Sequence, residues 1–580
     1  MCGIVGIAGG NPNLEELNSM LAQIRHRGPD GEGVHLAKGV GLGNVRLAIV
    51  DLSPAGAQPM LSPDGRYSLV YNGELYNHMA FRPELEASGV CFRGHSDTET
   101  LLWLLIRHGK CILPKLNGIF TFAFHDSLSG NLLLARDHMG VKSLYYAHGK
   151  YRRLLFASEI KALFVTGEVE PRLNVDDILE LFMFHFIAGE RTAFSNVYEL
   201  PPGHLLQYVD GRMRLSEFWN IASTAQDESS DDSNSETLDD ILDAAINRQL
   251  MADVPIGIMS SGGLDSGIVT ALAGRRNPQM TGFCFRDPAY GYDEFEEARS
   301  ASIPFNVSVE DVRIPEVAVP DLLTTLTWHY DEPLPRPHHI AAYAVSKRAQ
   351  EAGLKVLLAG EGGDELFGGY SRYLTFADEM SRSGDTSPLV FAHNRVALPR
   401  IARFWPGKRF LNGYRFWCAE ETKGLDLINR QLIVDQKTFL QHFLQRSDRM
   451  GMAAGVEIRV PLLDIPLVKY VNSLPGSEKI SNGITKVCLR SSARGLLPPA
   501  LVERPKQPFD MPMAPLLQQG PVADFLDDML LSKPRCADLF DEDGIVSLVR
   551  DLRAGQDDLW KVTWLLLTTE VWMRTFEVTV

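Results

Sequence analysis

The sequence has 580 residues, of which 45% are hydrophobic and 22% charged, and a formal net charge of −16. At roughly 100–200 residues per domain, this length predicts two to four domains that each bury a core. A chain this acidic is not expected to have nucleic acid or an anionic membrane as its main partner, because both carry negative charge. Backbone N–H groups and a magnesium ion can still hold phosphates locally, so nucleotide substrates stay open.

The cysteines and the two ends of the chain favour a cytoplasmic protein. The seven cysteines are scattered and form no C-x-x-C pair, so the sequence indicates neither a disulfide framework nor a zinc cluster. The N-terminus lacks the basic start and apolar run of a signal peptide. The apolar stretch 562–573 contains Glu570 and is too short to cross a bilayer, which predicts a helix of the core.

The first ~200 residues predict a strand-dominated α+β domain. Apolar runs separated by glycine turns indicate the strands. One helical pattern lies among them at 96–108, with Leu101, Leu104 and Leu105 on its apolar face. The strand-like runs are 39–50, 67–71, 120–124 and 132–135.

Residues 223–237 are polar and acidic and contain no large apolar side chain, a composition typical of a linker. An acidic surface loop within one domain is the alternative. We predict a first domain at 2–215, a linker at 216–237 and a second domain at 238–580.

After the linker the pattern changes to an alternation of helices and apolar strands. Such an alternation favours a parallel sheet with helices on both faces. The last ~200 residues are mostly helical in pattern. The predicted elements are a helix at 238–250, strands at 256–259, 280–285 and 355–358, and a helix that begins at Asp265.

Cys2 is a candidate nucleophile, because removal of Met1 would leave its thiol beside a free α-amine. That amine titrates near ~8 and can act as the general base of an N-terminal-nucleophile mechanism. A cysteine at position 2 is by itself more often incidental, so the surrounding residues decide between the two interpretations.

Downstream of Cys2, several motifs occur in a recognisable order. They are Arg27-Gly28-Pro29-Asp30, Arg46-Leu47-Ala48, Tyr71-Asn72-Gly73-Glu74, Ser96-Asp97-Thr98-Glu99 and Ala157-Ser158-Glu159. With Cys2, this set resembles the class II glutamine amidotransferase domain. The resemblance implies an α+β N-terminal-nucleophile fold, an αββα sandwich, that hydrolyses glutamine.

By this resemblance, a small set of groups would hold glutamine and its oxyanion. Arg46 would clamp the α-carboxylate with its planar fork, and Asp97, helped by Glu74, would pair with the α-ammonium. Asn72, which also contacts glutamine, and the backbone N–H of Gly73 would receive the oxyanion that forms when Cys2 attacks the amide. The sequence departs from the family at Asn44, Ala57 and Ser143, positions that we expect not to touch the chemistry.

A glycine-rich turn, Ser260-Ser261-Gly262-Gly263-Leu264-Asp265-Ser266, follows a predicted strand and opens a helix. Such a turn presents backbone N–H groups and a helix N-terminus to phosphate, although a Gly/Ser turn is often only a helix cap. It is not a Walker loop, because no Gly-Lys-Ser/Thr occurs in the chain. It resembles the S-G-G-x-D-S loop of ATP pyrophosphatases, which cleave ATP between the α- and β-phosphates and form acyl-adenylates.

Further motifs resemble those of asparagine synthetase. They are Leu358-Ala359-Gly360-Glu361-Gly362-Gly363-Asp364-Glu365, Glu457-Ile458-Arg459-Val460-Pro461 and the segment around Lys486. The resemblance implies that Asp265 and Asp364 bind Mg²⁺, that Lys486 neutralises pyrophosphate, and that Glu361 assists adenylate formation or amine attack. The implied ATP-binding residues are Met259, Ser260, Gly262, Gly263, Asp265, Ser266, Ala359 and Gly360.

The two sites together imply a carbon–nitrogen ligase that makes asparagine from aspartate, glutamine and ATP. The same chemistry on another carboxylate stays open, because Asp331–His339 and Pro508 depart from the family near the acceptor. Arg336 and Arg459 are candidate cations for the acceptor, or members of structural ion pairs. A β-lactam-synthetase-like cyclase would not need an intact Cys2 site, and a non-catalytic scaffold would not need an intact ATP loop. No nucleic-acid or membrane partner is expected, and a homodimer is left open.

Overall fold

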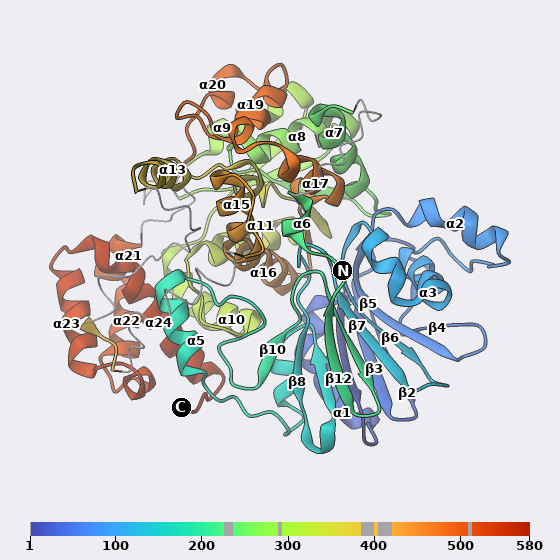
Figure 1. Ribbon diagram of the computed structural model, residues 1–580. Coiled ribbons are helices and arrows are strands. Elements are labelled where there is room, and N and C mark those ends of the chain that lie inside the picture. The colour runs from blue at the N-terminus through green and yellow to red at the C-terminus, as the bar shows by residue number, and fades with distance from the viewer. Residues whose placement is uncertain (1, 226–235, 288–292, 384–399, 404–419, 508–512) are drawn as a thin grey trace.

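The computed structural model describes residues 2–225, 236–287, 293–383, 400–403, 420–507 and 513–580. Residues 226–235 of the predicted acidic linker lie outside the described residues, as does Pro508. Figure 1 shows a β-sandwich from the N-terminal third, a parallel-sheet unit beside it, and a group of C-terminal helices. The predicted boundaries of the domains stay a prediction.

The N-terminal unit is a sandwich of two six-stranded antiparallel sheets. Buried Ile4, Val70, Ala123 and Phe156 pack between the sheets. One sheet has the order β10-β8-β9-β1-β3-β2, with β10 at Val197–Glu199, β8 at Tyr145–His148, β9 at Leu154–Ala157, β1 at Cys2–Ala8, β3 at Val40–Arg46 and β2 at Gly31–Ala37. The other has the order β12-β11-β7-β6-β5-β4, with β12 at Arg212–Glu217, β11 at His204–Val209, β7 at Asn131–Arg136, β6 at Gly118–Asp126, β5 at Tyr67–Leu75 and β4 at Met60–Leu61.

Helices cover the sandwich. Helix α1 (Leu14–Ile24) packs on β1 and β3, and α3 (Asp97–His108), with its neighbour α2 (His78–Ala87), packs on β5. The side chain of Ser96 caps α3 by accepting a hydrogen bond from Glu99 N, as the helical pattern from 96 predicts. The layers therefore run helix, sheet, sheet, helix, which confirms the predicted αββα sandwich.

The second unit contains a five-stranded parallel sheet of order β15-β14-β13-β16-β17. Along β16, Leu357 belongs to one hydrophobic cluster and Val356 and Leu358 to another, so both faces of the sheet are covered. This confirms the predicted α/β unit. Its strands are β13 (Ile256–Met259), β14 (Thr281–Phe285), β15 (Ser308–Val312), β16 (Val356–Leu358) and β17 (Glu457–Arg459), and its helices include α7 (Leu238–Gln249), α8 (Leu264–Arg276), α9 (Phe295–Ser302) and α11 (His338–Glu351).

The remainder of the chain is helical, as predicted. Helix α24 (Trp560–Thr575) contains the apolar stretch 562–573, and its Trp564 and Trp572 are fully buried. Within the described residues, no helix is long and apolar enough to cross a membrane. Further helices are α4 (Lys161–Phe164), α5 (Val175–Phe184), α6 (Ile221–Thr224), α10 (Val319–Tyr330), α12 (Gly363–Phe367), α13 (Ser371–Ser383), α15 (Leu427–Lys437), α16 (Phe439–Ala453), α17 (Ile465–Ser473), α18 (Gly476–Lys479), α19 (Val487–Ala493), α20 (Pro499–Val502), α21 (Ala514–Gln518), α22 (Pro521–Leu530) and α23 (Glu542–Arg553).

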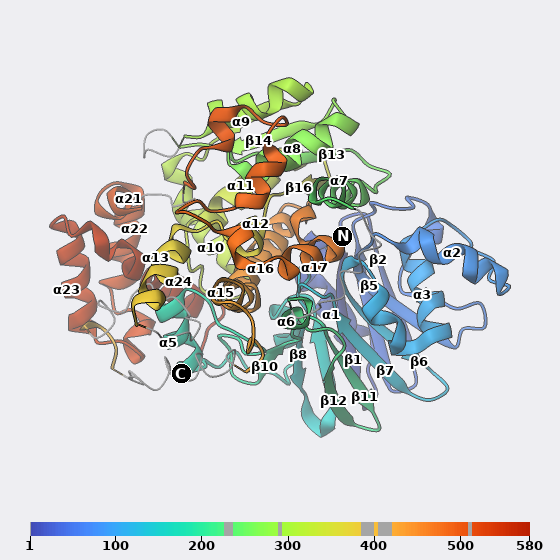
Figure 2. The same ribbon diagram turned by 45° about the horizontal axis from the view of Figure 1, so that its top comes forward.

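Helix α16 joins the two units. It contacts α10, α11, α15 and β17, and it also reaches the turn that contains Arg27. Both views place it in the middle of the molecule (Figures 1 and 2). Residues that serve both units can therefore be carried on one rigid element.

Candidate active sites

Cys2 begins strand β1 and lies opposite Arg46 of β3. Its backbone N donates to Asn72 Oδ1 at 3.1 Å, and its carbonyl accepts from Arg27 Nε at 3.2 Å. Burial raises the pKa of the Cys2 thiol, while nearby Arg46 and a hydrogen bond from Asn44 lower it. The backbone nitrogen that would become the free α-amine is thus held in place beside the thiol.

The expectation that Asn44 does not touch the chemistry stays a prediction. Asn44 lies opposite Ile4 in the β1–β3 pairing, and its amide donates to Gly3 O at 3.4 Å. The departure from the family therefore lies in the immediate surroundings of the nucleophile.

Asn72 and Gly73 lie on β5 next to Cys2, as an oxyanion site requires. Asn72 is fully buried, and within the described part of the chain its Nδ2 has no hydrogen-bond partner. A buried amide donor without a partner costs free energy unless a ligand binds it, so this group is available to a developing negative charge. Gly73 has φ +154°, and an added Cβ would lie 2.0 Å from Ile119 O, so only glycine fits there.

The proposed glutamine-binding residues are fixed by the same unit. Arg46 donates to Asp51 O at 2.5 Å and to Ser53 O at 3.2 Å. Asp97, at the start of α3, accepts from Leu75 N at 2.8 Å and Tyr71 Oη at 3.1 Å. Burial raises the pKa of Asp97, which these hydrogen bonds oppose. The partly exposed Arg46 guanidinium and the buried Asp97 carboxylate suit the carboxylate and the ammonium of an amino acid.

Glu74 connects the glutamine side to the second unit. Its Oε1 lies 3.6 Å from Arg459 Nη2, and its Oε2 has no hydrogen-bond partner among the described residues. Burial raises the pKa of Glu74 well above its usual value, and neighbouring Asp97 and Glu457 raise it further. Arg459 is itself fully buried, pairs with Glu457 at 2.6 Å and donates to Gln249 O and Met251 O. Arg459 is therefore a structural cation, the second of the two roles considered for it.

The ATP loop has the expected position after β13 and before α8. Ser266 Oγ lies 3.0 Å from Ser261 Oγ and accepts from Ser261 N, which folds the turn back on itself. Gly262 has φ +66°, a conformation that favours glycine, and Gly263 is the N-cap of α8. Gly360 packs against this turn, since a Cβ there would lie 2.7 Å from Ser266 N. Met259 ends β13, and Ala359 follows β16.

Asp265 and Asp364 converge on one ammonium group. Lys486 Nζ lies 2.5 Å from Asp265 Oδ2 and 2.6 Å from Asp364 Oδ1, and Lys506 Nζ lies 2.9 Å from Asp364 Oδ2. Burial raises the pKa of Asp265, whereas the two lysines hold the pKa of Asp364 below its usual value despite burial. Gly369 leaves room for the cluster, because a Cβ there would lie 1.9 Å from Asp364 Oδ1.

This donor set fits a magnesium ion. No group of three or more His, Cys, Asp or Glu side chains suited to a metal occurs in the described ranges. Two carboxylates that face one cation are nevertheless what Mg²⁺ needs when phosphates and water complete its six ligands.

Glu361 follows β16 and forms an ion pair with Arg446 of α16. Sequence reasoning missed Arg446, which is buried at 5% exposure. It also assigned no role to Lys506 or to Arg27. Arg27 is fully buried and pairs with Glu159 at 2.9 Å and with Asp448 of α16 at 2.9 Å. No short motif marks Arg446, and only the fold brings these residues to their partners.

Two family models match the chain. The model for asparagine synthase covers residues 237–574, and the model for the glutamine amidotransferase domain covers residues 1–219. The chain belongs to the asparagine synthase family. Members of this family with a glutamine amidotransferase domain are glutamine-dependent ligases that use ATP as a co-substrate, and this chain is such a ligase.

Curated relatives span most of the chain. Asparagine synthetase [glutamine-hydrolyzing] 1 of Bacillus subtilis is 28% identical over 99% of this chain and 96% of its own length. Asparagine synthetase [glutamine-hydrolyzing] 3 of the same organism is 30% identical over 90% and 88%. Amidase chry2 of Gibberella zeae is 31% identical over 80% and 79%. The relatives thus share the architecture and carry more than one functional name.

Proposed function

We propose that this chain moves ammonia from glutamine to a carboxylate that ATP has activated as an acyl-adenylate, and that the acceptor is aspartate. The observation that supports this most is the pairing of two sites on one helix. Through Arg27 and Asp448, α16 is tied to the carbonyl of Cys2, and through Arg446 it is tied to Glu361.

In the first half-reaction, Cys2 attacks the glutamine amide and its α-amine accepts the thiol proton. Asn72 Nδ2 and Gly73 N–H stabilise the oxyanion, the α-ammonium returns its proton to the amide nitrogen, and neutral ammonia leaves to give a thioester. Water then releases glutamate. Arg46 and Asp97 hold the α-carboxylate and α-ammonium throughout, so specificity for glutamine rests on two opposite charges.

In the second half-reaction, a carboxylate oxygen of the acceptor attacks the α-phosphate of ATP, and pyrophosphate leaves. The loop 260–263 and the N-terminus of α8 bind phosphate, while Lys486 and Lys506 neutralise the leaving pyrophosphate. Asp265 and Asp364 would hold magnesium, which supplies positive charge to the phosphates. Ammonia then attacks the acyl carbon, Glu361 accepts a proton, and AMP leaves.

Arg446 and Arg336 are the cations available on the acceptor side in this proposal. Arg446 pairs with Glu361, and the Arg336 guanidinium lies 5.8 Å from the Phe439 ring centre. Together with a carboxylate they suit a zwitterionic dicarboxylic acid such as aspartate.

A second acceptor class is a larger, less polar acid. The motivating observation is a group of rings around Arg446, in which its guanidinium lies 5.0 Å from the Phe443 ring centre and the ring centroids of His338 and Phe443 are 5.5 Å apart. Two relatives, chry2 and chyE, are named amidases and not asparagine synthetases. A homodimer and a cytoplasmic location stay predictions.

ATP–pyrophosphate exchange tests the acceptor without needing ammonia. The chain is incubated with ATP, magnesium, labelled pyrophosphate and one candidate acid at a time. Aspartate is expected to support exchange, with glutamate and succinate as controls that differ by one methylene or lack the ammonium. Exchange with an aromatic or long-chain acid, and none with aspartate, would show that the acceptor is the larger, less polar acid and not aspartate.

A further inference from the structure

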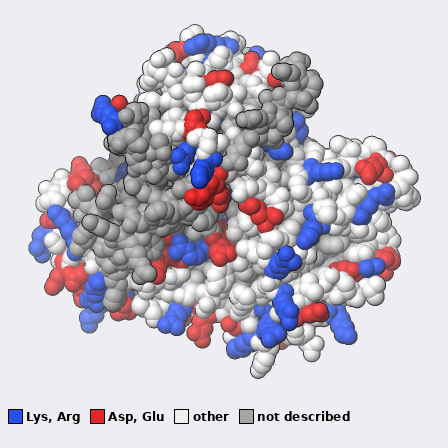
Figure 3. Space-filling model, viewed as in Figure 1, with Lys and Arg blue, Asp and Glu red and all other residues white. Residues whose placement is uncertain are grey.

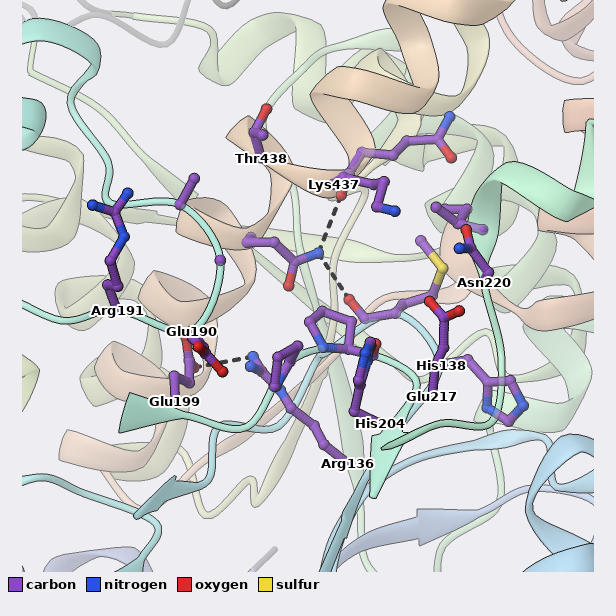
Figure 4. A pocket seen from close by; sticks show the side chains of 18 of the residues that line it. Arg136, His138, Glu190, Arg191, Glu199, His204, Glu217, Asn220, Lys437 and Thr438 are labelled. Atoms are coloured by element: carbon purple, nitrogen blue, oxygen red, sulfur yellow. Dashed lines mark hydrogen bonds and ion pairs between the residues drawn. The ribbon is translucent and has the colours of Figure 1, made fainter. Parts of the chain in front are cut away.

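A large cavity opens between the β-sandwich and helices α15 and α16, away from both proposed sites. Its volume is about 1030 Å³. Figure 4 shows side chains from the two units facing each other across it, with Arg136, Glu199 and His204 on one side and Lys437 and Thr438 on the other. We call this space the outer cavity.

The outer cavity is acidic in balance. Asp176, Glu190 and Glu217 line it and are exposed. The cations of its wall already have anionic or carbonyl partners: Arg191 pairs with Asp177 and Glu180, and Lys437 pairs with Glu421. Arg136, also in the wall, is buried and donates to the carbonyl oxygens of Gly140, Lys142 and Leu200. These exposed carboxylates favour a cation at the mouth, whereas the face drawn in Figure 3 mixes both signs.

A second, much smaller cavity of about 30 Å³ lies beside the first. The two share Ile187, Arg191, Glu199 and Gln441 in their walls. This inner cavity has room for a small molecule such as water or ammonia.

Polar groups line the inner cavity. His442 is 4% exposed, and its Nε2 has no hydrogen-bond partner in the described ranges. Glu332 is also buried and accepts from Ala193 N at 2.7 Å and from Gln445 Nε2 at 3.0 Å. A buried imidazole nitrogen without a partner is expected to bind a small polar molecule.

The inner cavity ends at the acceptor side of the synthetase site. His442 and Gln445 belong to α16, and Gln445 precedes Arg446, whose guanidinium pairs with Glu361. The rings of His442 and His339 are 5.4 Å apart, and those of His442 and His338 are 5.9 Å apart. His442 and Arg446 lie four residues apart on α16 and therefore on the same face of the helix.

We propose that the outer and inner cavities form an entrance for free ammonium from solvent, which gives up a proton to Glu332 and reaches the synthetase site as ammonia. The inference rests on the proposed function. The step balances: the N–H bond of ammonium breaks, the O–H bond of the Glu332 carboxyl forms, and neutral ammonia carries the lone pair onward. The charged pair becomes a neutral pair, which a buried site favours because both ions lose hydration there.

The surroundings of Glu332 support its role as the proton acceptor. Burial, helped by nearby Glu199 and Asp331, raises its pKa to about 7 against the two hydrogen bonds. Below that pH the carboxyl is protonated and cannot accept a proton from ammonium, whereas above it the carboxylate can. The other titratable side chains that line the inner cavity with it are Arg191, Glu199, Tyr330 and His442.

The test uses the full chain with Cys2→Ala, so that glutamine supplies no ammonia. Ammonium chloride is titrated at saturating ATP, magnesium and acceptor, and amide product is measured. Ile187→Trp, which adds bulk to the wall that the two cavities share, should lower kcat/KM for ammonium by about tenfold or more, because the inner cavity is small. Glu332→Gln should do the same. Leu36→Trp, at an exposed position on β2, is the matched control and should change nothing.

A double variant at the exposed mouth leaves the interior of both cavities untouched. Glu190→Lys with Glu217→Lys reverses charge at the exposed mouth and should raise KM for ammonium about tenfold by lowering its local concentration. When Cys2 is intact, glutamine-dependent turnover should stay unchanged in this double variant.

Two results would overturn the entrance. The first is an unchanged kcat/KM for ammonium in Ile187→Trp and Glu332→Gln variants that still support ATP–pyrophosphate exchange. The second is a lack of ammonia-dependent product in a Cys2→Ala chain that still supports exchange. Loss of exchange with every acid in the unaltered chain would instead refute the proposed function.

Discussion

The two sites differ in how far they are built before a substrate arrives. The glutaminase site sits on strands of a closed sandwich, and its key donor, Asn72 Nδ2, is buried and ready. The synthetase site sits on loops after parallel strands, and its charges are occupied by one another: Lys486 lies between Asp265 and Asp364. In the proposed function, magnesium would take the place of that lysine between the carboxylates, and the lysine would turn toward phosphate. The glutaminase site therefore depends on fixed geometry, and the synthetase site depends on exchange of ion partners.

The largest expected effect comes from removal of Cys2, the nucleophile of the glutaminase site. Cys2→Ala should lower glutamine hydrolysis by at least about 10⁴-fold, since no other group is proposed to attack the amide. Ammonia-dependent amide formation should persist. Glutamate release and amide formation from ammonium chloride are measured in parallel, and retained glutamate release would show that another nucleophile operates.

Asp265→Asn tests the exchange of ion partners in the synthetase site. Loss of one carboxylate should weaken magnesium–ATP binding and lower ATP–pyrophosphate exchange by about 10²–10³-fold, while glutamine hydrolysis survives. Asp243→Asn, an exposed carboxylate of α7 that pairs with Arg276, is the matched control. If glutamine hydrolysis fell in step with exchange in a folded chain, the two sites would not be separable.

Asn72→Ala sharpens the claim that the glutaminase site is built in advance. Removal of one oxyanion donor is expected to lower kcat for glutamine hydrolysis by about 10²-fold with little change in KM. Asn131→Ala, at the exposed start of β7, should leave both constants as they were. A large rise in KM with an unchanged kcat would assign Asn72 to ground-state binding instead.

The smallest effect on either rate concerns the buried Glu457–Arg459 pair between the sites. Despite burial, Arg459 lowers the pKa of Glu457 to about 2, below its unfolded value of about 4.5. Its carboxylate therefore stabilises the fold above the unfolded pKa, and this contribution is lost as pH falls toward the folded pKa. The unaltered chain should melt above Glu457→Gln at pH 7, and the difference in Tm should shrink as pH falls from about 4.5. A difference that is constant with pH would contradict the pairing.

The contrast between the sites also explains what the sequence could predict. The ATP loop and the strand before it are local: an apolar run, a Gly/Ser turn and a helix start share one short segment, and the structure has them at the predicted residues. The Arg446–Glu361 pair joins residues 85 apart, and Arg27–Asp448 joins residues 421 apart. No local pattern encodes such partners. The position of Asn44 near the nucleophile has a related cause, because strand pairing brings it opposite Ile4.

The central claim is that the two sites on this chain carry out one coupled reaction on aspartate. The most direct measurement is the amount of glutamate, AMP and asparagine formed from amide-¹⁵N-glutamine, ATP, magnesium and aspartate without added ammonium. We expect equal amounts of glutamate, AMP and asparagine, with the ¹⁵N label in the asparagine amide. Release of glutamate without AMP or asparagine, at saturating aspartate, would contradict it.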